Sequence, residues 1–428
     1  MKYSKFGLLC SQELQSVRYH LGRIETFILI CYYLLDYLQN IRFLDSLLIF
    51  SNKKGHLNRQ HLDVYNLKNE RLGHEVHLKK RPTGSVKVED FELVKVEIPD
   101  LKEEGDFLVR NVWMSIDPFL RIYMVKGTRF APPFELHKPL DGGCIGEVIE
   151  SKSSNFKVGD YVKANFGWRE YWLGKDTQIE KKSISKVDPT LGPLRSFLGL
   201  LGITGMTAYI GLFKICNLRE EQDTVFVSSA AGGVGSAACQ LAKIKGCHVV
   251  GSCGSDEKVK WLVNELGVDY AFNYRKIGLD NISEELKRAC PKGIDLYFDN
   301  VGGKHLEAAI DNMNIFGRIV LCGTTSQYND NDDASSDNQD QNQRVTKSIS
   351  EGPSNLSLAV SHRLKLQGFI WRDHFDILNE FNTNMSKWIR EDKIKLKESI
   401  FEGLENAPQA FAGLFRGDTI GRTLVRLY

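Results

Sequence analysis

Short segments in which apolar and polar residues alternate mark the first half of the chain. From about Lys79 onward, the alternation is clearest at residues 91–99 (FELVKVEIP), and it returns at 105–118, 139–151 and 158–172. A period of two residues places the apolar side chains on one face of a strand, and the glycines between the segments favour turns. Strands at intervals of roughly ten to twenty residues predict a small β-barrel.

The period changes near Gly199. Residues 205–216 and 232–246 have helical spacing, and the apolar run 223–231 lies between them. Further short apolar segments follow, separated by helical stretches, at 247–253, 270–274, 294–301, 317–323 and 364–371. Because near-continuous apolar strands that alternate with helices are buried on both faces, this half predicts an α/β fold with a doubly wound parallel sheet.

Two segments fit neither pattern. Residues 1–75 contain one apolar run, 27–35, which Asp36 ends. This run is far shorter than the roughly 20 residues of a spanning helix, and no signal-peptide cleavage site follows it. We interpret 1–75 as an appended extension, with a membrane-surface anchor as the less favoured alternative. Residues 330–344 are polar and acidic, which predicts a disordered loop.

These patterns divide the chain into parts. We expect an extension at 1–75, a first β domain at 76–200, a dinucleotide-binding domain at 201–390 that contains the acidic loop, and a return to the first domain at 391–428. A chain of 428 residues is long enough for two domains.

Composition and charge exclude several classes of protein. A net charge of +2 with no cluster of basic and aromatic residues argues against a nucleic-acid partner. The nine cysteines form no C-x-x-C pair, which gives no sign of a zinc ribbon or a redox dithiol. Scattered thiols fit a reducing compartment, so we expect a cytoplasmic protein with no membrane association.

The glycine-rich stretch AAGGVGSAA is the strongest chemical signal. Gly232, Gly233 and Gly235 lie between a buried strand and an apolar-faced helix, with Val234 among them. Glycines there let backbone N–H groups approach a pyrophosphate at the positive end of the helix. The first glycine of the usual motif is absent, because Ser229 and Ala230 occupy that region.

The stretch GSCGSDEK follows the second strand of this unit. NAD enzymes place an acid there for the ribose 2′-hydroxyl, whereas this chain has the uncharged Cys253 and Gly254. Ser255 opens a helix and Lys258 lies one turn further on, so a hydroxyl, N–H groups and a cation are available for a 2′-phosphate. An ordinary solvated lysine is the alternative. The residues favour NADP over NAD.

A possible zinc motif is present at residues 73–75 (GHE), but it precedes the predicted barrel strands. In zinc alcohol dehydrogenases this motif leads directly into a glycine-rich strand. The equivalent strand here, GGCIGEV, follows Leu140 and Asp141. Neither three catalytic ligands nor a four-cysteine lobe is evident, so we expect no metal.

Several ordered motifs together carry a family resemblance. The segments SIDPFLR, AAGGVGSAACQLAKIKG, YFDNVGG, FGRIVLCGTTSQYN, LQGFI and GDTIGRTLVRL resemble the zinc-independent branch of the medium-chain dehydrogenase/reductases. Within that branch they are similar to the prostaglandin reductase, or alkenal/one oxidoreductase, group of NADPH-dependent double-bond reductases. The similarity runs from about Lys79 to the C-terminus. It implies a GroES-like β-barrel catalytic domain, a Rossmann domain, an NADPH cofactor, and a homodimer as a possibility.

The resemblance also implies roles for individual residues. Lys258 and Tyr274 would meet the 2′-phosphate, and Tyr328 is the best remaining phenol for catalysis. Phe119 replaces the usual tyrosine of the first-domain motif. Together with Tyr123 and Phe130 it is a candidate wall of the substrate site, and ordinary packing within the barrel is the alternative for each of the three. The predicted cofactor contacts are Thr207, Gly232, Gly233, Val234, Gly235, Ser255, Lys258, Tyr274, Asn300, Cys322, Gly323, Tyr328, Phe369, Ile370, Trp371 and Thr419, the last in place of the family's asparagine.

The implied reaction is metal-free reduction of a carbon–carbon double bond conjugated to a carbonyl group. Hydride adds to the β-carbon, and Tyr328 or the cofactor ribose hydroxyl stabilises the enolate oxygen. A phenol or water then protonates the α-carbon. Two alternatives remain at this point: a quinone reductase with the same fold and cofactor, and a non-catalytic NADPH-binding protein.

Overall fold

The fold is described from a computed structural model, for residues 71–126, 132–180, 183–329 and 352–428. The acidic loop 330–344, Phe130 and nearly all of the extension 1–75 lie outside these ranges. Residues 1–69 and residues 70–428 form separate units, and only the second is described.

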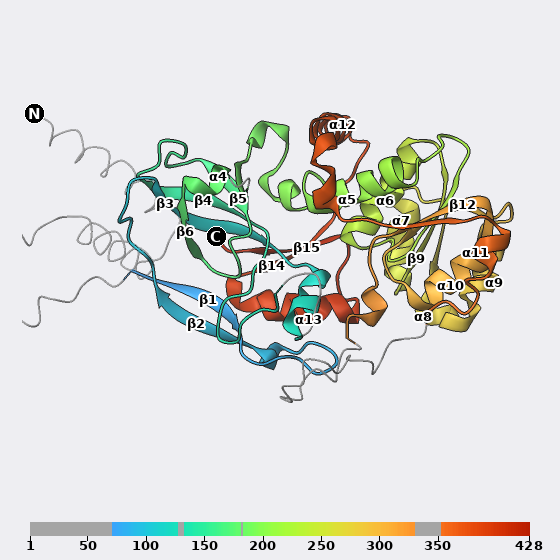
Figure 1. Cartoon of the computed structure of the whole chain (residues 1–428), viewed down its shortest axis with the longest axis horizontal. Helices are drawn as coiled ribbons and strands as arrows, with labels where there is room; N and C mark the ends of the chain where they lie inside the picture. The colour runs from blue at the N-terminus through green and yellow to red at the C-terminus, as the bar shows by residue number, and fades with distance from the viewer. Residues whose placement is uncertain (1–70, 127–131, 181–182, 330–351) are drawn as a thin grey trace, which may run out of the picture. The chain divides into compact units, whose positions relative to one another are not determined.

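A six-stranded parallel sheet occupies the second half of this unit (Figure 1). Its strands run in the order β10-β9-β8-β11-β12-β13, and every neighbouring pair is parallel. Their bounds are β8 Thr224–Val227, β9 His248–Cys253, β10 Tyr270–Asn273, β11 Ile294–Asp299, β12 Met313–Leu321 and β13 Lys365–Gly368. In chain order this is 3-2-1-4-5-6, the Rossmann arrangement. The predicted doubly wound sheet is therefore confirmed.

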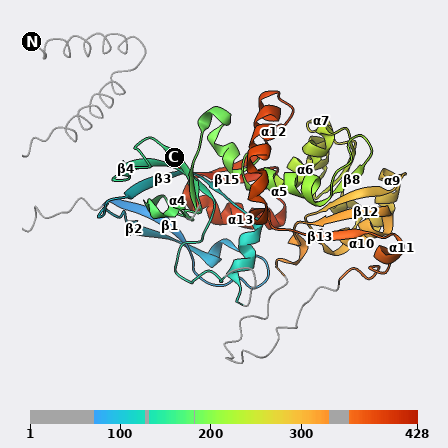
Figure 2. The ribbon, with the colours of Figure 1, turned by 45° about the horizontal axis from the view of Figure 1, so that its top comes forward.

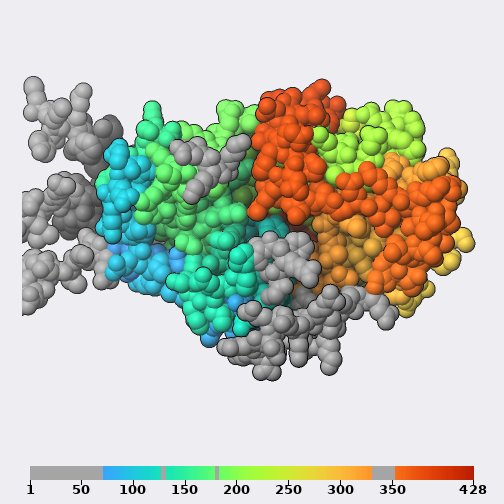
Figure 3. Space-filling view, viewed as in Figure 1, coloured from blue at the N-terminus to red at the C-terminus, as the bar shows by residue number. Residues whose placement is uncertain are grey.

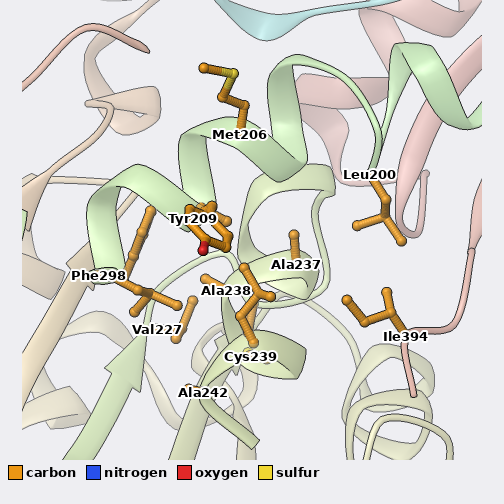
Figure 4. Close-up of a cluster of buried hydrophobic side chains, with 14 of the residues drawn as sticks. Leu200, Met206, Tyr209, Val227, Ala237, Ala238, Cys239, Ala242, Phe298 and Ile394 are labelled. Carbon is orange, nitrogen blue, oxygen red and sulfur yellow. The ribbon is translucent and has the colours of Figure 1, made fainter. Parts of the chain in front are cut away.

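Helices cover both faces of this sheet (Figure 2). Val225 and Val227 of β8 pack into one core cluster, whereas Phe226 between them packs into another. Figure 4 shows the first cluster, in which Val227 lies near Ala238 of a helix. This cluster includes residues of α5 Ile203–Tyr209, α6 Gly233–Ile244, α7 Asp256–Asn264 and α12 Leu378–Arg390, and the other includes residues of α9 Ile282–Ala289 and α10 Gly303–Asn312. Burial on both faces explains the near-continuous apolar strands.

The first half of the unit forms a mostly antiparallel sheet. Its order is β14-β15-β3-β4-β5-β7, with β6 paired to β3. The bounds are β3 Asp106–Ser115, β4 Cys144–Ser151, β5 Tyr161–Ala164, β6 Tyr171–Lys175, β7 Ile184–Lys186, β14 Glu398–Glu402 and β15 Arg422–Arg426. The last strand, β15, pairs antiparallel with β3, so the end of the chain returns to the first sheet. Between β14 and β15 lies helix α13, Ala407–Arg416.

The first strand begins earlier than we expected. β1, Leu72–Leu78, pairs with β2, Phe91–Glu97, so strand structure starts before Lys79 and the expected boundary at residue 76 falls inside β1. The alternation of apolar and polar residues did not predict this strand, because its charged side chains are paired with residues far along the chain. Glu75, for example, pairs with Arg169 at 3.3 Å. The other domain boundaries stay predictions.

The two sheets meet at the glycine-rich turn. The N–H of Gly421 donates to the carbonyl oxygen of Ala231 at 2.7 Å, and Gly421 also forms an isolated parallel bridge with Gly232. In the space-filling view, residues around α12, in orange-red, lie in the middle of the visible face, between the green first half and the yellow and orange residues of the parallel sheet (Figure 3). Within the described ranges, no helix is long and apolar enough to cross a membrane.

Candidate functional site

The glycine-rich turn connects β8 to α6 at the carboxyl edge of the parallel sheet. A Cβ at Gly235 would lie 2.2 Å from the carbonyl oxygen of Ser229, so only glycine permits this approach of helix to strand. Ser229 has φ +50°, a left-handed conformation that glycine adopts more easily. No side chain caps the first turn of α6, which leaves its first N–H groups available to a dinucleotide pyrophosphate.

Ser255 and Lys258 lie together at the end of β9. Ser255 is the N-cap of α7, and its hydroxyl accepts from the backbone N–H of Lys258 at 3.3 Å. Lys258 is only 9% exposed and donates from Nζ to the carbonyl oxygen of Gly417 at 2.6 Å. Burial lowers the pKa of this amine. Lys258 is therefore not the ordinary solvated lysine of the alternative interpretation.

Tyr274 follows β10 and lies beside the same loop. Its hydroxyl is 3.4 Å from the position that a Cβ of Gly254 would occupy. The ring of His305 packs edge-on against the Tyr274 ring, with centroids 5.0 Å apart. His305 is 2% exposed, and its Nε2 has no hydrogen-bond partner among the described residues. Nothing in the sequence pattern around this histidine predicts its place beside Tyr274.

Burial of His305 predicts a dependence of stability on pH. It lowers the pKa of His305 from 6.5 to about 4, so the unfolded chain binds a proton between these values that the folded chain does not. The contribution of neutral His305 to the free energy of unfolding is therefore fully present above pH 6.5. About 3 kcal/mol of it is lost as the pH falls to 4. His305→Phe is expected to remove this part of the decrease in the free energy of unfolding. Urea unfolding between pH 4 and pH 6.5 measures the difference. An unchanged pH profile would contradict the assignment.

Asn300, Gly323 and Tyr328 come together at the carboxyl ends of β11 and β12. The Asn300 side chain donates to the carbonyl oxygen of Ser228 at 2.8 Å, across the junction of β8 and β11. A Cβ at Gly323 would lie 3.3 Å from both the Asn300 carbonyl oxygen and the Tyr328 hydroxyl. The strand order reverses at β8, and ligands of open α/β sheets bind at such a point.

Tyr328 and Cys322 both remain protonated at neutral pH. Burial, followed by the neighbouring Cys322, raises the pKa of the Tyr328 phenol to about 12. Burial, followed by Asp299, likewise raises the pKa of the Cys322 thiol to about 12. The site thus offers a neutral phenol as a hydrogen-bond donor, and no reactive thiolate.

An aromatic wall, formed by Phe119 and Tyr123 from the first half of the unit, lies close to Tyr328. Phe119 and Tyr123 lie on the 3₁₀ helix η3, Pro118–Met124, with ring centroids 6.1 Å apart. Arg121 of the same helix donates from Nε to the side-chain oxygen of Asn329 at 3.3 Å. Because Asn329 directly follows Tyr328, this contact places η3 beside the phenol.

The remaining predicted cofactor residues come from α5, from the segment after β13 and from the segment before β15. Thr207 is half-buried on α5, which packs on α6, and Thr419 is buried two residues before Gly421. Phe369 and Trp371 pack against the first core cluster after β13, whereas Ile370 between them is exposed. The structure therefore places these residues around the same edge of the sheet, and their contacts with a cofactor stay predictions.

A buried ion pair that the sequence did not indicate lies behind the glycine-rich turn. Arg422 of β15 contacts both carboxylate oxygens of Asp117, at 2.5 and 3.0 Å, and donates from Nε to the Leu198 carbonyl oxygen at 2.7 Å. A Cβ at Gly233 would lie 3.4 Å from Cδ of Arg422. Arg422 thus supports the turn from the side of the first sheet.

The GHE residues are fully engaged with neighbouring side chains. His74 contacts Glu170 at 3.1 Å, and Glu75 contacts His77 at 2.8 Å. In the part of the chain that the structure describes, no group of three or more His, Cys, Asp or Glu residues is placed to hold a metal ion.

Comparison with known proteins identifies the family. Residues 74–182 match the family described as "N-terminal domain of oxidoreductase", and residues 233–389 match "Zinc-binding dehydrogenase". The chain is 39% identical to prostaglandin reductase 1 of Bos taurus over 350 residues, which are 82% of this chain and 97% of that protein. The chain belongs to the zinc-independent medium-chain dehydrogenase/reductases. Within them it falls in the double-bond reductase group, as the motifs indicated.

Two further members of this group support the assignment. The NADP-dependent 2-alkenal reductase of Nicotiana tabacum is 37% identical over 355 residues, covering 82% of this chain and 95% of that enzyme. The crystal structure of CurA in complex with NADPH, from Vibrio vulnificus, has a TM-score of 0.73 at 33% identity, covering 83% of this chain and 99% of that chain. The medium-chain dehydrogenase/reductase described here combines a Rossmann sheet with a separate, mostly antiparallel sheet.

Proposed function

We propose that this protein is an NADPH-dependent reductase of the carbon–carbon double bond in α,β-unsaturated aldehydes and ketones. The observation that carries the proposal is the position of Tyr328. Its protonated phenol lies beside Asn300 and Gly323 at the switch point of a Rossmann sheet, next to the aromatic wall on η3. The relatives named above include a prostaglandin reductase and a 2-alkenal reductase.

The residues of the crevice fit NADPH. The turn at Gly232–Gly235 would hold the pyrophosphate, because its glycines admit close approach and the first turn of α6 has uncapped N–H groups. Lys258 and Tyr274 would bind the 2′-phosphate beside Gly254. Asn300, Cys322 and Gly323 would border the nicotinamide, with Thr207, Thr419 and the residues 369–371 around it. When bound, NADPH supplies the hydride that the β-carbon receives.

The side chains of this protein orient the substrate and supply a proton to its α-carbon. The Tyr328 hydroxyl is a donor for the carbonyl oxygen on which negative charge develops as the double bond is reduced. The same phenol, or water, protonates the α-carbon. Phe119 and Tyr123 exclude water from one side of the substrate and contact its apolar chain.

Turnover by the purified full-length chain tests the proposal. NADPH oxidation is followed spectrophotometrically with trans-2-nonenal and with 1,4-benzoquinone as separate substrates. Turnover of the enal supports a double-bond reductase. Turnover of the quinone alone would favour a quinone reductase, and NADPH binding without turnover of either would favour a non-catalytic protein.

Tyr328→Phe tests the phenol directly. We expect kcat for trans-2-nonenal to fall by about 100-fold, with the KM for NADPH changed less than about twofold, because only the donor hydroxyl is lost. Since the pKa of Tyr328 is about 12, the wild-type rate is not expected to decline through its ionisation below about pH 11. Tyr270→Phe is the matched control, since its hydroxyl bonds Glu285 and Arg288 outside the site. An unchanged kcat in the Tyr328 variant would assign proton donation to water.

We further propose a cytoplasmic location and a homodimer. All seven cysteines in the described ranges are free, as in a reducing compartment. Among the described strands, β13 is the edge of the parallel sheet and pairs on one side only, and Phe316 and Val360 are exposed in the neighbouring segments. Sedimentation of the purified chain as a monomer would contradict the dimer.

A further inference from the structure

A second cation lies beside Lys258 in the folded chain. Arg275 follows Tyr274 on the short helix α8, Tyr274–Ile277, and its guanidinium donates from Nη2 to the carbonyl oxygen of Arg416 at 2.9 Å. Lys258 donates to the next carbonyl oxygen along, that of Gly417. A Cβ at Gly417 would lie 3.1 Å from Arg275 Nη2 and 3.6 Å from Lys258 Nζ. The two cationic groups therefore converge on one small region.

Neither cation is neutralised by an acid. No ion pair involving Lys258 or Arg275 occurs among the described residues, and the nearby Asp418 pairs with Arg416 at 2.7 Å. The two cations donate hydrogen bonds to carbonyl oxygens, which carry no full negative charge. The positive potential around them is therefore left in excess, and this favours an anion beside them. The two carbonyl oxygens belong to the last residue and the C-cap of helix α13. The C-terminal end of a helix is the negative pole of its dipole, which helps to hold both cations in place.

The Arg275 side chain also reaches the end of β9, where a dinucleotide is expected to place its adenosine. At Gly254, directly after β9, a Cβ would lie 3.2 Å from Arg275 Nε and 3.4 Å from the Tyr274 hydroxyl. A dinucleotide places its adenosine ribose at this strand end. The Tyr274 ring lies next to the guanidinium, 5.9 Å from centroid to Cζ. Arg275 and Tyr274 thus lie directly beside Gly254, and Lys258 lies next to Arg275 near Gly417, so all three are close to the expected position of the ribose 2′-substituent.

We propose that Arg275 is a second ligand of the NADPH 2′-phosphate and a determinant of cofactor specificity in this chain. The proposal rests on the proposed function, in which Lys258 and Tyr274 take the same phosphate. Arginine adds a planar set of donors that matches phosphate oxygens in pairs, whereas lysine contributes a single charged group. The carbonyl oxygens after α13 orient both side chains before the cofactor arrives, which reduces the entropy lost on binding.

Nucleotide fragments test the assignment without any need for turnover. Adenosine 2′,5′-bisphosphate and adenosine 5′-monophosphate differ only in the 2′-phosphate, and calorimetry measures the affinity of the full-length chain for each. Arg275→Gln is expected to weaken binding of the bisphosphate by about tenfold and binding of the monophosphate by less than about twofold. Arg275→Lys is expected to recover part of the loss, since it keeps the charge but not the paired donors.

Lys276→Gln provides the matched control. This neighbour on α8 is solvent-exposed and pairs with Asp256 at 3.2 Å, so both affinities should remain unchanged. A purely structural role for Arg275, through Arg416, would weaken both nucleotides equally and would overturn the proposal, as would no loss at all. If the wild-type chain does not bind the bisphosphate more tightly than the monophosphate, both the assignment of NADPH as cofactor and the role of Arg275 fail. If the wild type and Arg275→Gln show the same preference, only the role of Arg275 fails.

Discussion

Lys258→Ala is expected to raise the KM for NADPH by about 30- to 150-fold and to change the KM for NADH by less than about threefold. The ammonium group is buried near Gly417, beside the guanidinium of Arg275 that reaches Gly254, and from there it can donate a charge-assisted hydrogen bond to a 2′-phosphate. Such a bond contributes about 2–3 kcal/mol, which corresponds to that range of affinity. NADH has no phosphate at this position and loses nothing when the amine is removed. Steady-state kinetics with the two cofactors and trans-2-nonenal measure the difference.

Lys260→Ala is the control for this prediction. Lys260 lies on the same helix, α7, but its side chain is exposed on the other side from Gly417. Its removal should leave the preference for NADPH over NADH unchanged. Equal losses for both cofactors in Lys258→Ala would instead mean that the lysine supports the fold of the loop, and the phosphate assignment would be abandoned.

Asp117→Ala is expected to lower the free energy of unfolding by about 3–5 kcal/mol. The side chains of Asp117 and Arg422 are 8% and 7% exposed, so the variant leaves a buried guanidinium with only the Leu198 carbonyl oxygen as a partner. Because Arg422 also packs against Gly233, the affinity for NADPH should decline together with stability. Urea unfolding without cofactor, followed by NADPH titration, separates the two effects.

A second ion pair on the same strand provides the comparison. Arg426 of β15 pairs with Glu402 at 3.4 Å, and these side chains are 51% and 65% exposed. Glu402→Gln should therefore cost less than about 1 kcal/mol. If Asp117→Ala costs no more than Glu402→Gln, the buried pair does not hold the two sheets together at the glycine-rich turn.

Local patterns were sufficient to predict the parts of the site that lie close together in the sequence. The helix cap at Ser255, the buried strand before it and the absence of an acid at Cys253 and Gly254 identified the position of Lys258. The apolar runs of β8, β9, β11 and β12 predicted the parallel sheet, because burial on both faces leaves few polar positions.

Those patterns could not predict contacts between residues that are far apart in the sequence. Asp117 and Arg422 are 305 positions apart, and nothing in either motif shows that they meet. Arg275 is an ordinary basic residue until α13 brings its carbonyl oxygens close to it. The strand β1 was missed for a similar reason, since the partners of its charged side chains, Arg169 and Glu170, lie nearly a hundred positions later.

The contact between Gly421 and Ala231 has a consequence for synthesis of the protein. During translation the parallel sheet is complete once β13 has emerged, but the turn at Ala231 still lacks its partner from β15. Gly421 and Arg422 are made only after β13, α12 and α13. A product that terminates just before them would keep its Rossmann strands and lose the backing of the nucleotide turn. Cofactor binding therefore reports that β15 has been made and has reached the turn.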